Sequence, residues 1–198
     1  MNHAGRMHTT DPVLTRYVEA VHTIVSGTRD PEATASAVES ASRELIPPGF
    51  STPTELQRED PSAPYSRNLV YSDPEHRFAV VAMVWPAFRE TRIHDHVNWC
   101  VVRCLQGTCL ETRYSLTDAR LAEGFAEVRT TGARIVPAGA VLGLTPPPSS
   151  NLHRMANAAW PTAITLHTYG DPGTRARVFD PVTRKVEIVA LRFHNLAP

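Results

Sequence analysis

The sequence predicts a mainly β domain, a sandwich or small barrel with two N-terminal α-helices packed against its outside. Three observations favour this fold class. Two segments with helical periodicity come first, many short apolar strand-like runs follow from about residue 67, and Gly and Pro separate those runs at short intervals. At 198 residues the chain is long enough to bury one full core without disulfides.

The first predicted helix covers residues 11–27. Asp11 is a suitable N-cap, and Pro12 suits the first helical position because its missing N–H has no helical partner there. Its apolar residues recur at helical spacing on one face: Leu14, Tyr17, Val18, Val21 and Val25. The pair Asp30-Pro31 repeats the start signal and predicts a second helix that runs to about Leu45.

The predicted strands are rich in valine and other residues that fit a pleated, half-buried surface. They cover the ranges Phe78–Trp85, Trp99–Leu105, Thr108–Tyr114, Phe125–Thr130, Arg134–Val136, Ala163–Tyr169, Arg177–Phe179 and Val186–Leu191. We therefore expect one domain with three parts. Residues 1–10 form a flexible N-terminus, residues 11–64 form the helices and a polar, proline-marked loop, and residues 65–198 form the β-barrel.

Composition narrows the functional classes. Twenty basic and twenty acidic residues cancel, so we expect neither a nucleic-acid partner nor an anionic membrane surface. No apolar run approaches the ~20 residues of a membrane span, and the polar N-terminus lacks the apolar core of a signal peptide. The three cysteines at positions 100, 104 and 109 are too few and too close together for a disulfide framework. We expect a cytoplasmic protein with reduced thiols.

Histidines form the pattern with the clearest chemical meaning. His94 and His96 stand at i and i+2 of an extended segment, so their side chains point to the same face. Such a pair can bind one metal ion side by side, and the distant His153 can complete a facial set with open positions. The simpler alternative is three unrelated histidines, each satisfied by ordinary hydrogen bonds.

These features resemble the cupin superfamily. The layout of His94-Asp95-His96, Cys100 and Gly107 is similar to the first cupin motif, with cysteine in the slot of the usual glutamate. Pro137-Ala138-Gly139 and the segment from His153 to Asn157 are similar to the second motif, with a longer insert between them. The resemblance implies a double-stranded β-helix, a jelly-roll barrel, whose metal keeps three neutral imidazoles and no carboxylate.

The missing glutamate is typical of the thiol dioxygenase branch, and the chain most resembles the cysteine dioxygenase family. The matching segments are residues 65–70, 105–107, 111–112, 153–154 and 166–169. The resemblance implies Fe(II) held by His94, His96 and His153, no organic cofactor, and L-cysteine and dioxygen as substrates. Cysteine would bind through its thiolate and amine, dioxygen would take the remaining position, and the product would be cysteine sulfinic acid.

The same resemblance implies roles for Arg67 and Tyr65 in substrate binding. A guanidinium gives a planar, bidentate match to the substrate carboxylate, which lysine cannot give. The alternative for Arg67 is a surface salt bridge, because this chain is rich in arginine.

Three residues at i, i+2 and i+4 resemble the relay of this family. Thr165, His167 and Tyr169 share one face of a strand, with threonine replacing the usual serine, and the hydroxyl would orient the histidine and through it the tyrosine. The alternative is a core tyrosine beside a buried histidine. Cys100 resembles a cysteine that becomes cross-linked to the relay tyrosine, here Tyr169, and its alternative is a small buried thiol.

Other functions stay open at this stage. A cupin oxygenase of a specialised natural-product pathway would convert cysteine or another small thiol into a different oxidised product, such as a sulfonamide or sulfonate precursor. The metal could be Ni(II), because three histidines accept several divalent ions. A metal-binding cupin without turnover would consume no oxygen with any thiol.

Overall fold

The computed structural model describes residues 5–146, 151–171 and 173–196. Residues 1–4 of the expected flexible N-terminus and residues 197–198 of the expected barrel lie outside these ranges. Residues 5–8 differ from that expectation, because they pair with a strand: Gly5 N donates to Ser72 O at 2.7 Å, and His8 N donates to Val70 O at 2.9 Å.

Both predicted helices are present, as α1 (Pro12–Gly27) and α2 (Pro31–Leu45). The Asp11 carboxylate accepts hydrogen bonds from two backbone N–H groups in the first turn of α1, each at 2.9 Å. Asp30 caps α2 by accepting from Ala33 N at 3.0 Å. The caps satisfy donors that have no partner inside a helix, which is why both helices begin where the sequence predicts.

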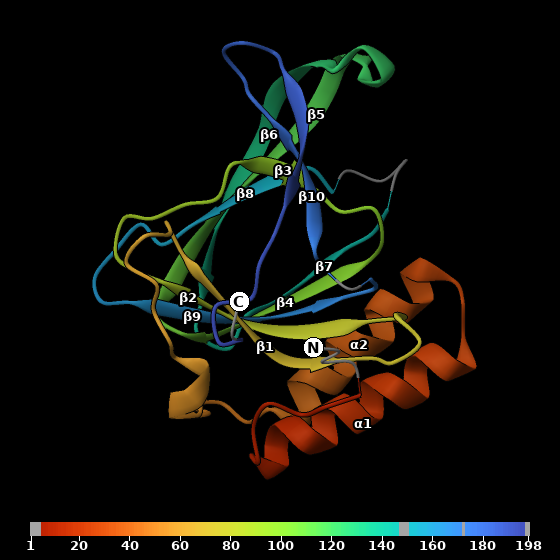
Figure 1. The fold of residues 1–198 in the computed structure, drawn as a ribbon, viewed down its shortest axis with the longest axis vertical. Coiled ribbons are helices and arrows are strands. Elements are labelled where there is room, and N and C mark those ends of the chain that lie inside the picture. The colour runs from red at the N-terminus through yellow and green to blue at the C-terminus, as the bar shows by residue number, and fades with distance from the viewer. Residues whose placement is uncertain (1–4, 147–150, 172, 197–198) are drawn as a thin grey trace.

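The described strands form two sheets that face each other (Figure 1). The five-stranded sheet has the order β1 (Ser66–Ser72), β2 (Ala79–Trp85), β9 (Ala163–Tyr169), β4 (Cys100–Gln106) and β7 (Val141–Leu144). The six-stranded sheet has the order β11 (Val186–Ala190), β10 (Arg175–Phe179), β3 (Ile93–Asp95), β8 (His153–Ala156), β5 (Thr108–Arg120) and β6 (Phe125–Pro137). All their pairings are antiparallel, and distant segments become neighbours, which confirms the expected jelly-roll barrel.

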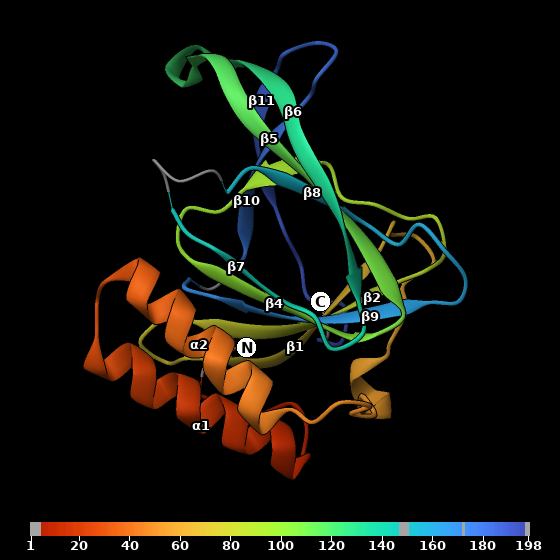
Figure 2. The ribbon, with the colours of Figure 1, turned by 180° about the vertical axis from the view of Figure 1, so that it is seen from behind.

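The helices cover the outer face of the five-stranded sheet (Figure 2). Their apolar faces share one buried cluster with this sheet, which includes Leu14 and Val38 from the helices and Val80 and Leu166 from the strands. The Tyr17 hydroxyl also lies 2.7 Å from the Thr168 hydroxyl of β9. The other face of the sheet is thus left to line the barrel interior.

The structure differs from the predicted strands in several places. Four strands, β1, β3, β7 and β8, are not among those predicted, and three of these have only three or four residues, too few for a readable alternation. β5 continues past Tyr114 to Arg120, and the two runs predicted within residues 125–136 are one strand, β6. The added residues pair in a long hairpin whose tip is solvent-exposed, so its side chains are mostly polar and give no strand pattern.

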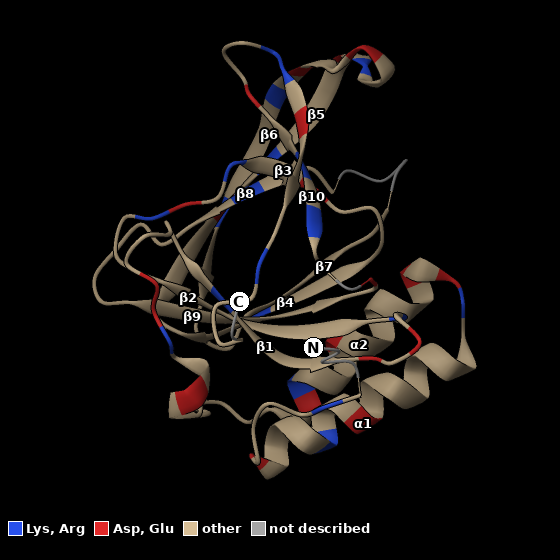
Figure 3. Cartoon of the chain, viewed as in Figure 1, with Lys and Arg blue, Asp and Glu red and all other residues tan. Residues whose placement is uncertain are grey.

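No helix in the described ranges is long and apolar enough to cross a membrane. Residues of both charge signs are spread over the helices, strands and loops rather than gathered on one element (Figure 3).

Candidate active site

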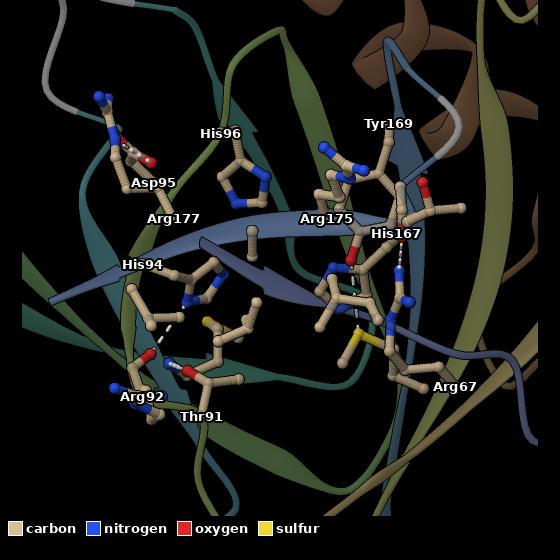
Figure 4. Close-up of a pocket in the computed structure, with 18 of the residues that line it drawn as sticks. Arg67, Thr91, Arg92, His94, Asp95, His96, His167, Tyr169, Arg175 and Arg177 are labelled. Carbon is tan, nitrogen blue, oxygen red and sulfur yellow. Dashed lines mark hydrogen bonds and ion pairs between the residues drawn. The ribbon is translucent and has the colours of Figure 1, made fainter. Parts of the chain in front are cut away.

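A cavity of about 550 Å3 opens into the barrel between the two sheets (Figure 4). Its wall includes six of the residues that the sequence singled out: Tyr65, Arg67, His94, His96, His167 and Tyr169. The remaining three lie fully buried at its margin, each bonded to or directly paired with a lining residue: Cys100, His153 and Thr165. A volume of this size is ordinary for a small-molecule site.

Three histidines meet at one end of this cavity. His94 in β3 lies directly opposite His153 in β8, and His96 follows immediately after β3. One nitrogen from each ring lies within 4.8 Å of the others. His96 and His153 are 57 positions apart in the chain, and they are brought together because β3 and β8 are neighbours in the six-stranded sheet.

Hydrogen bonds orient two of these rings. His94 Nδ1 lies 3.0 Å from the Arg92 carbonyl oxygen, and His153 Nδ1 lies 2.9 Å from a Glu111 carboxylate oxygen. Both acceptors hold the proton on Nδ1, so each Nε2 keeps a lone pair for a metal. His153 Nε2 and His96 Nε2 lie 3.1 Å apart, so these donor atoms converge. Three imidazoles in this arrangement fit a divalent first-row transition metal.

The surroundings keep two of these imidazoles neutral. Burial, and then the neighbouring His153, lower the pKa of His94 to about 3. Burial and the neighbouring histidines hold the pKa of His96 well below its usual value. Because metals bind the neutral form of histidine, His94 and His96 are ready to bind a metal at neutral pH.

Glu111 is a site residue that sequence reasoning missed. Its side chain is fully buried and accepts from His153 through one oxygen, while Arg113 and Arg134 donate to the other. Burial raises its pKa, but the bond from His153 and the nearby Arg113 outweigh it and bring that pKa to about 2. Glu111 stands 42 residues from its histidine partner. Residues 111–112 match the family, but that match assigned Glu111 no role and gave no sign of the contact.

Arg67 lies inside the protein rather than in a surface salt bridge. Its residue is 3% exposed, and Nη2 donates to the Gly173 carbonyl oxygen at 2.6 Å. The guanidinium carbon also lies 5.2 Å from the ring centroid of Phe193 and 5.9 Å from that of Tyr169. Among the described residues no carboxylate lies within ion-pair distance of this guanidinium, so a positive charge lines the cavity.

Tyr65 lies beside Arg67 and packs on the ring of Trp85, with the ring centroids 4.9 Å apart. The Trp85 indole N–H in turn donates to the Thr165 hydroxyl at 2.8 Å. That hydroxyl lies 2.8 Å from His167 Nε2. Because an indole N–H can only donate, the hydroxyl proton is left for His167 Nε2, and the proton of this imidazole is placed on Nδ1.

The expected relay reaches His167 but does not continue by a hydrogen bond to Tyr169. Within the described ranges His167 Nδ1 has no hydrogen-bond partner, because Nε2 faces Thr165. The His167 and Tyr169 rings are stacked instead, with centroids 5.6 Å apart. The Tyr169 hydroxyl donates to the Met83 sulfur at 3.5 Å, and burial raises the pKa of this phenol.

Cys100 lies directly opposite Tyr169 in the pairing of β4 with β9. It is a free and fully buried thiol, and burial raises its pKa well above the usual value. Cys104 and Cys109 are also free and buried, and like Cys100 they are not part of the cavity wall.

Comparisons with known proteins bear on this site. A family model described as cysteine dioxygenase type I matches residues 51–182, which include Arg67 and all three histidines. An uncharacterized conserved protein with a double-stranded β-helix domain from Klebsiella pneumoniae is similar in structure, at 15% identity over 60% of this chain and 80% of that chain, with a TM-score of 0.45. An RmlC-like cupin from Ralstonia eutropha is similar at 16% identity over 64% of this chain and 66% of that chain, with a TM-score of 0.43.

Proposed function

This chain belongs to the cysteine dioxygenase type I family, and we propose that it oxidises L-cysteine with dioxygen to cysteine sulfinic acid at an Fe(II) ion. The observation that carries this proposal is one cavity that joins a cluster of three histidines to a buried arginine, which has no carboxylate partner among the described residues. The histidines would hold the iron, and the arginine would hold an anionic group of the substrate.

His94, His96 and His153 would bind the metal through neutral nitrogens. Bound there, Fe(II) would supply the redox chemistry that dioxygen requires. A set of three imidazoles brings no negative charge of its own. A thiolate substrate supplies that charge, so the site favours a thiol over a neutral alcohol or amine.

Arg67 would fix the substrate by its carboxylate. A guanidinium has five N–H donors, and the contacts with the carbonyl oxygens of Gly173 and Arg192 engage only part of them. The fork that remains suits a bidentate contact with a carboxylate. Tyr65 and Tyr169 line the same cavity and would contact the substrate there.

His167 and Tyr169 would face the reacting sulfur. The phenol of Tyr169 is protonated near neutral pH, and burial raises its pKa further, so it can donate a hydrogen bond to an oxygen of the substrate or product. The reaction balances without a reductant. Both atoms of one dioxygen molecule become bonded to sulfur, and the four electrons that sulfur loses reduce that dioxygen.

Oxygen uptake by the iron-loaded protein tests this proposal. The protein is reconstituted with Fe(II) without oxygen and then given air-saturated buffer with L-cysteine, mercaptopropionate or cysteamine. We expect uptake of one dioxygen per cysteine and cysteine sulfinate as the product. Uptake with a different sulfur product would indicate an oxygenase of a specialised pathway instead. No oxygen uptake with any of these thiols, with either Fe(II) or Ni(II) bound, would contradict an oxygenase function.

A further inference from the structure

A buried carboxylate stands behind the histidine cluster. The Glu111 side chain is 0% exposed, and it lies in β5, outside the cavity wall. An ionised carboxylate is costly to bury unless its charge is compensated and its oxygens are hydrogen-bonded. Its place in the core therefore requires partners, and the described residues supply three.

The two oxygens of Glu111 have different partners. Oε1 lies 2.9 Å from His153 Nδ1. Oε2 accepts from Arg113 Nε at 3.1 Å and from Arg134 Nε at 2.5 Å. One oxygen is thus left to the histidine, while two positive charges act on the other.

The strand register produces this arrangement. Arg134 in β6 lies directly opposite Glu111, and Arg113 lies opposite His153 across the pairing of β5 with β8. Glu111 and Arg113 are two residues apart on one strand, so they share a face. Four side chains from three neighbouring strands therefore meet on one face of the six-stranded sheet.

We propose that Glu111 is a positioning residue that sets the metal affinity of His153, and that Arg113 and Arg134 moderate its effect. The proposal rests on the proposed metal site. A carboxylate that accepts the Nδ1 proton fixes the ring orientation and makes Nε2 a stronger donor. Each arginine draws charge away from the carboxylate and adds a positive charge near the bound cation, so it weakens the same donor.

Opposite effects of the two charge types follow from this geometry. Glu111→Gln keeps the shape but removes the negative charge, so the affinity for a divalent metal should fall by about 10- to 100-fold. Arg134→Gln removes a positive charge from a half-exposed side chain, so the metal should bind more tightly. A merely structural role would make both substitutions weaken binding or leave it unchanged.

The test is titration of the metal-free protein with Co(II), followed by its visible absorption spectrum and by competition with Fe(II) in the absence of oxygen. The variants are Glu111→Gln and Arg134→Gln. Their matched controls are Asp118→Asn on β5 and Arg129→Gln on β6. Each control makes the same change of charge on the same strand as its variant, but at an exposed residue. We expect weaker binding and an altered spectrum for the first variant, tighter binding for the second, and wild-type behaviour for both controls.

Two results would overturn the inference, and they are distinguishable. Wild-type protein that binds one Co(II) with an affinity unchanged by Glu111→Gln would remove Glu111 from the metal site and leave the proposed function standing. Wild-type protein that binds neither Co(II) nor Fe(II) would contradict both the role of Glu111 and the proposed function. If Glu111→Gln fails to fold, Arg134→Gln decides alone, and weaker binding by that variant contradicts the proposal.

Discussion

Cys100 and Tyr169 are directly paired across the adjacent antiparallel strands β4 and β9. Side chains of such a pair stand on the same face, with Cβ atoms about 4.5–5.5 Å apart. The thiol of Cys100 is fully buried, and Tyr169 lines the cavity. This register brings a thiol next to a phenol ring beside the proposed iron.

We predict that part of the protein made with iron and oxygen carries a thioether between the Cys100 sulfur and the Tyr169 ring. Forming that bond removes two hydrogen atoms, which reduce dioxygen. Intact-mass measurement should show a species lighter by two hydrogens, and Cys100→Ser should lose it while Cys104→Ser keeps it. A single mass in wild-type protein after turnover would leave Cys100 as a buried thiol.

Removing a histidine of the cluster should abolish stoichiometric metal binding. His94→Ala and His153→Ala each leave two donors of three, which cannot hold the metal facially. Metal content after reconstitution and desalting is the measurement. His76→Asn is the control, because His76 is an exposed turn residue with a positive φ that asparagine tolerates. Full metal content in His153→Ala would refute the ligand assignment.

Substitution of Arg67 should weaken binding of carboxylate-bearing thiols. Loss of hydrogen bonds to a charged group costs about 1.5–3 kcal/mol, so kcat/KM for L-cysteine should fall roughly 10- to 100-fold in Arg67→Ala, mainly through KM. Cysteamine, which has the same thiol and amine without the carboxylate, should be affected little. An equal loss with both substrates would point to general damage instead of a missing carboxylate contact.

Thr165 should matter for its hydroxyl rather than its size. Thr165→Val leaves the Trp85 N–H and His167 Nε2 without their shared partner, which should cost about 1–3 kcal/mol of unfolding free energy and reduce kcat. Thr165→Ser retains the hydroxyl and should restore both quantities. Chemical denaturation and steady-state kinetics measure them, and equal behaviour of the two variants would show that the hydroxyl is dispensable.

Acid should destabilise the metal-free protein below about pH 6.5. Burial lowers the pKa of His94 to about 3 and holds those of His96 and His167 well below their usual value. As pH falls, the unfolded chain therefore binds more protons than the folded protein does. The free energy of unfolding then decreases by up to about 1.4 kcal/mol per pH unit for each imidazole. Urea denaturation between pH 7 and 4 measures the slope. His167→Gln should reduce this slope. A free energy of unfolding that does not change with pH would contradict buried neutral imidazoles.

The sequence predicted well the elements that carry a local signal. Asp-Pro pairs mark the starts of both helices because they satisfy donors that every helix leaves open. The strands β2, β4 and β9 were predicted because both of their faces are largely buried, which gives each of them a mainly apolar run of residues. The motifs that match the family also predicted that His94, His96 and His153 come together, as they do in the structure.

Contacts between distant strands could not be predicted in this way. The bond between Glu111 and His153 depends on the register of β5 against β8, which no single segment encodes. The orientation of His167 depends on an indole that lies 80 residues from Thr165 in the chain. Each of these contacts arises from pairing in the barrel, so each needs the three-dimensional structure.

Turnover with isotopically labelled dioxygen tests the central claim most directly. The Fe(II)-loaded protein is mixed with L-cysteine under dioxygen that contains only heavy oxygen, and the product is weighed by mass spectrometry. The account predicts cysteine sulfinate with both oxygens labelled, formed by wild-type protein and not by His94→Ala. Unlabelled sulfinate, or the same rate in His94→Ala, would contradict dioxygenation at the histidine cluster.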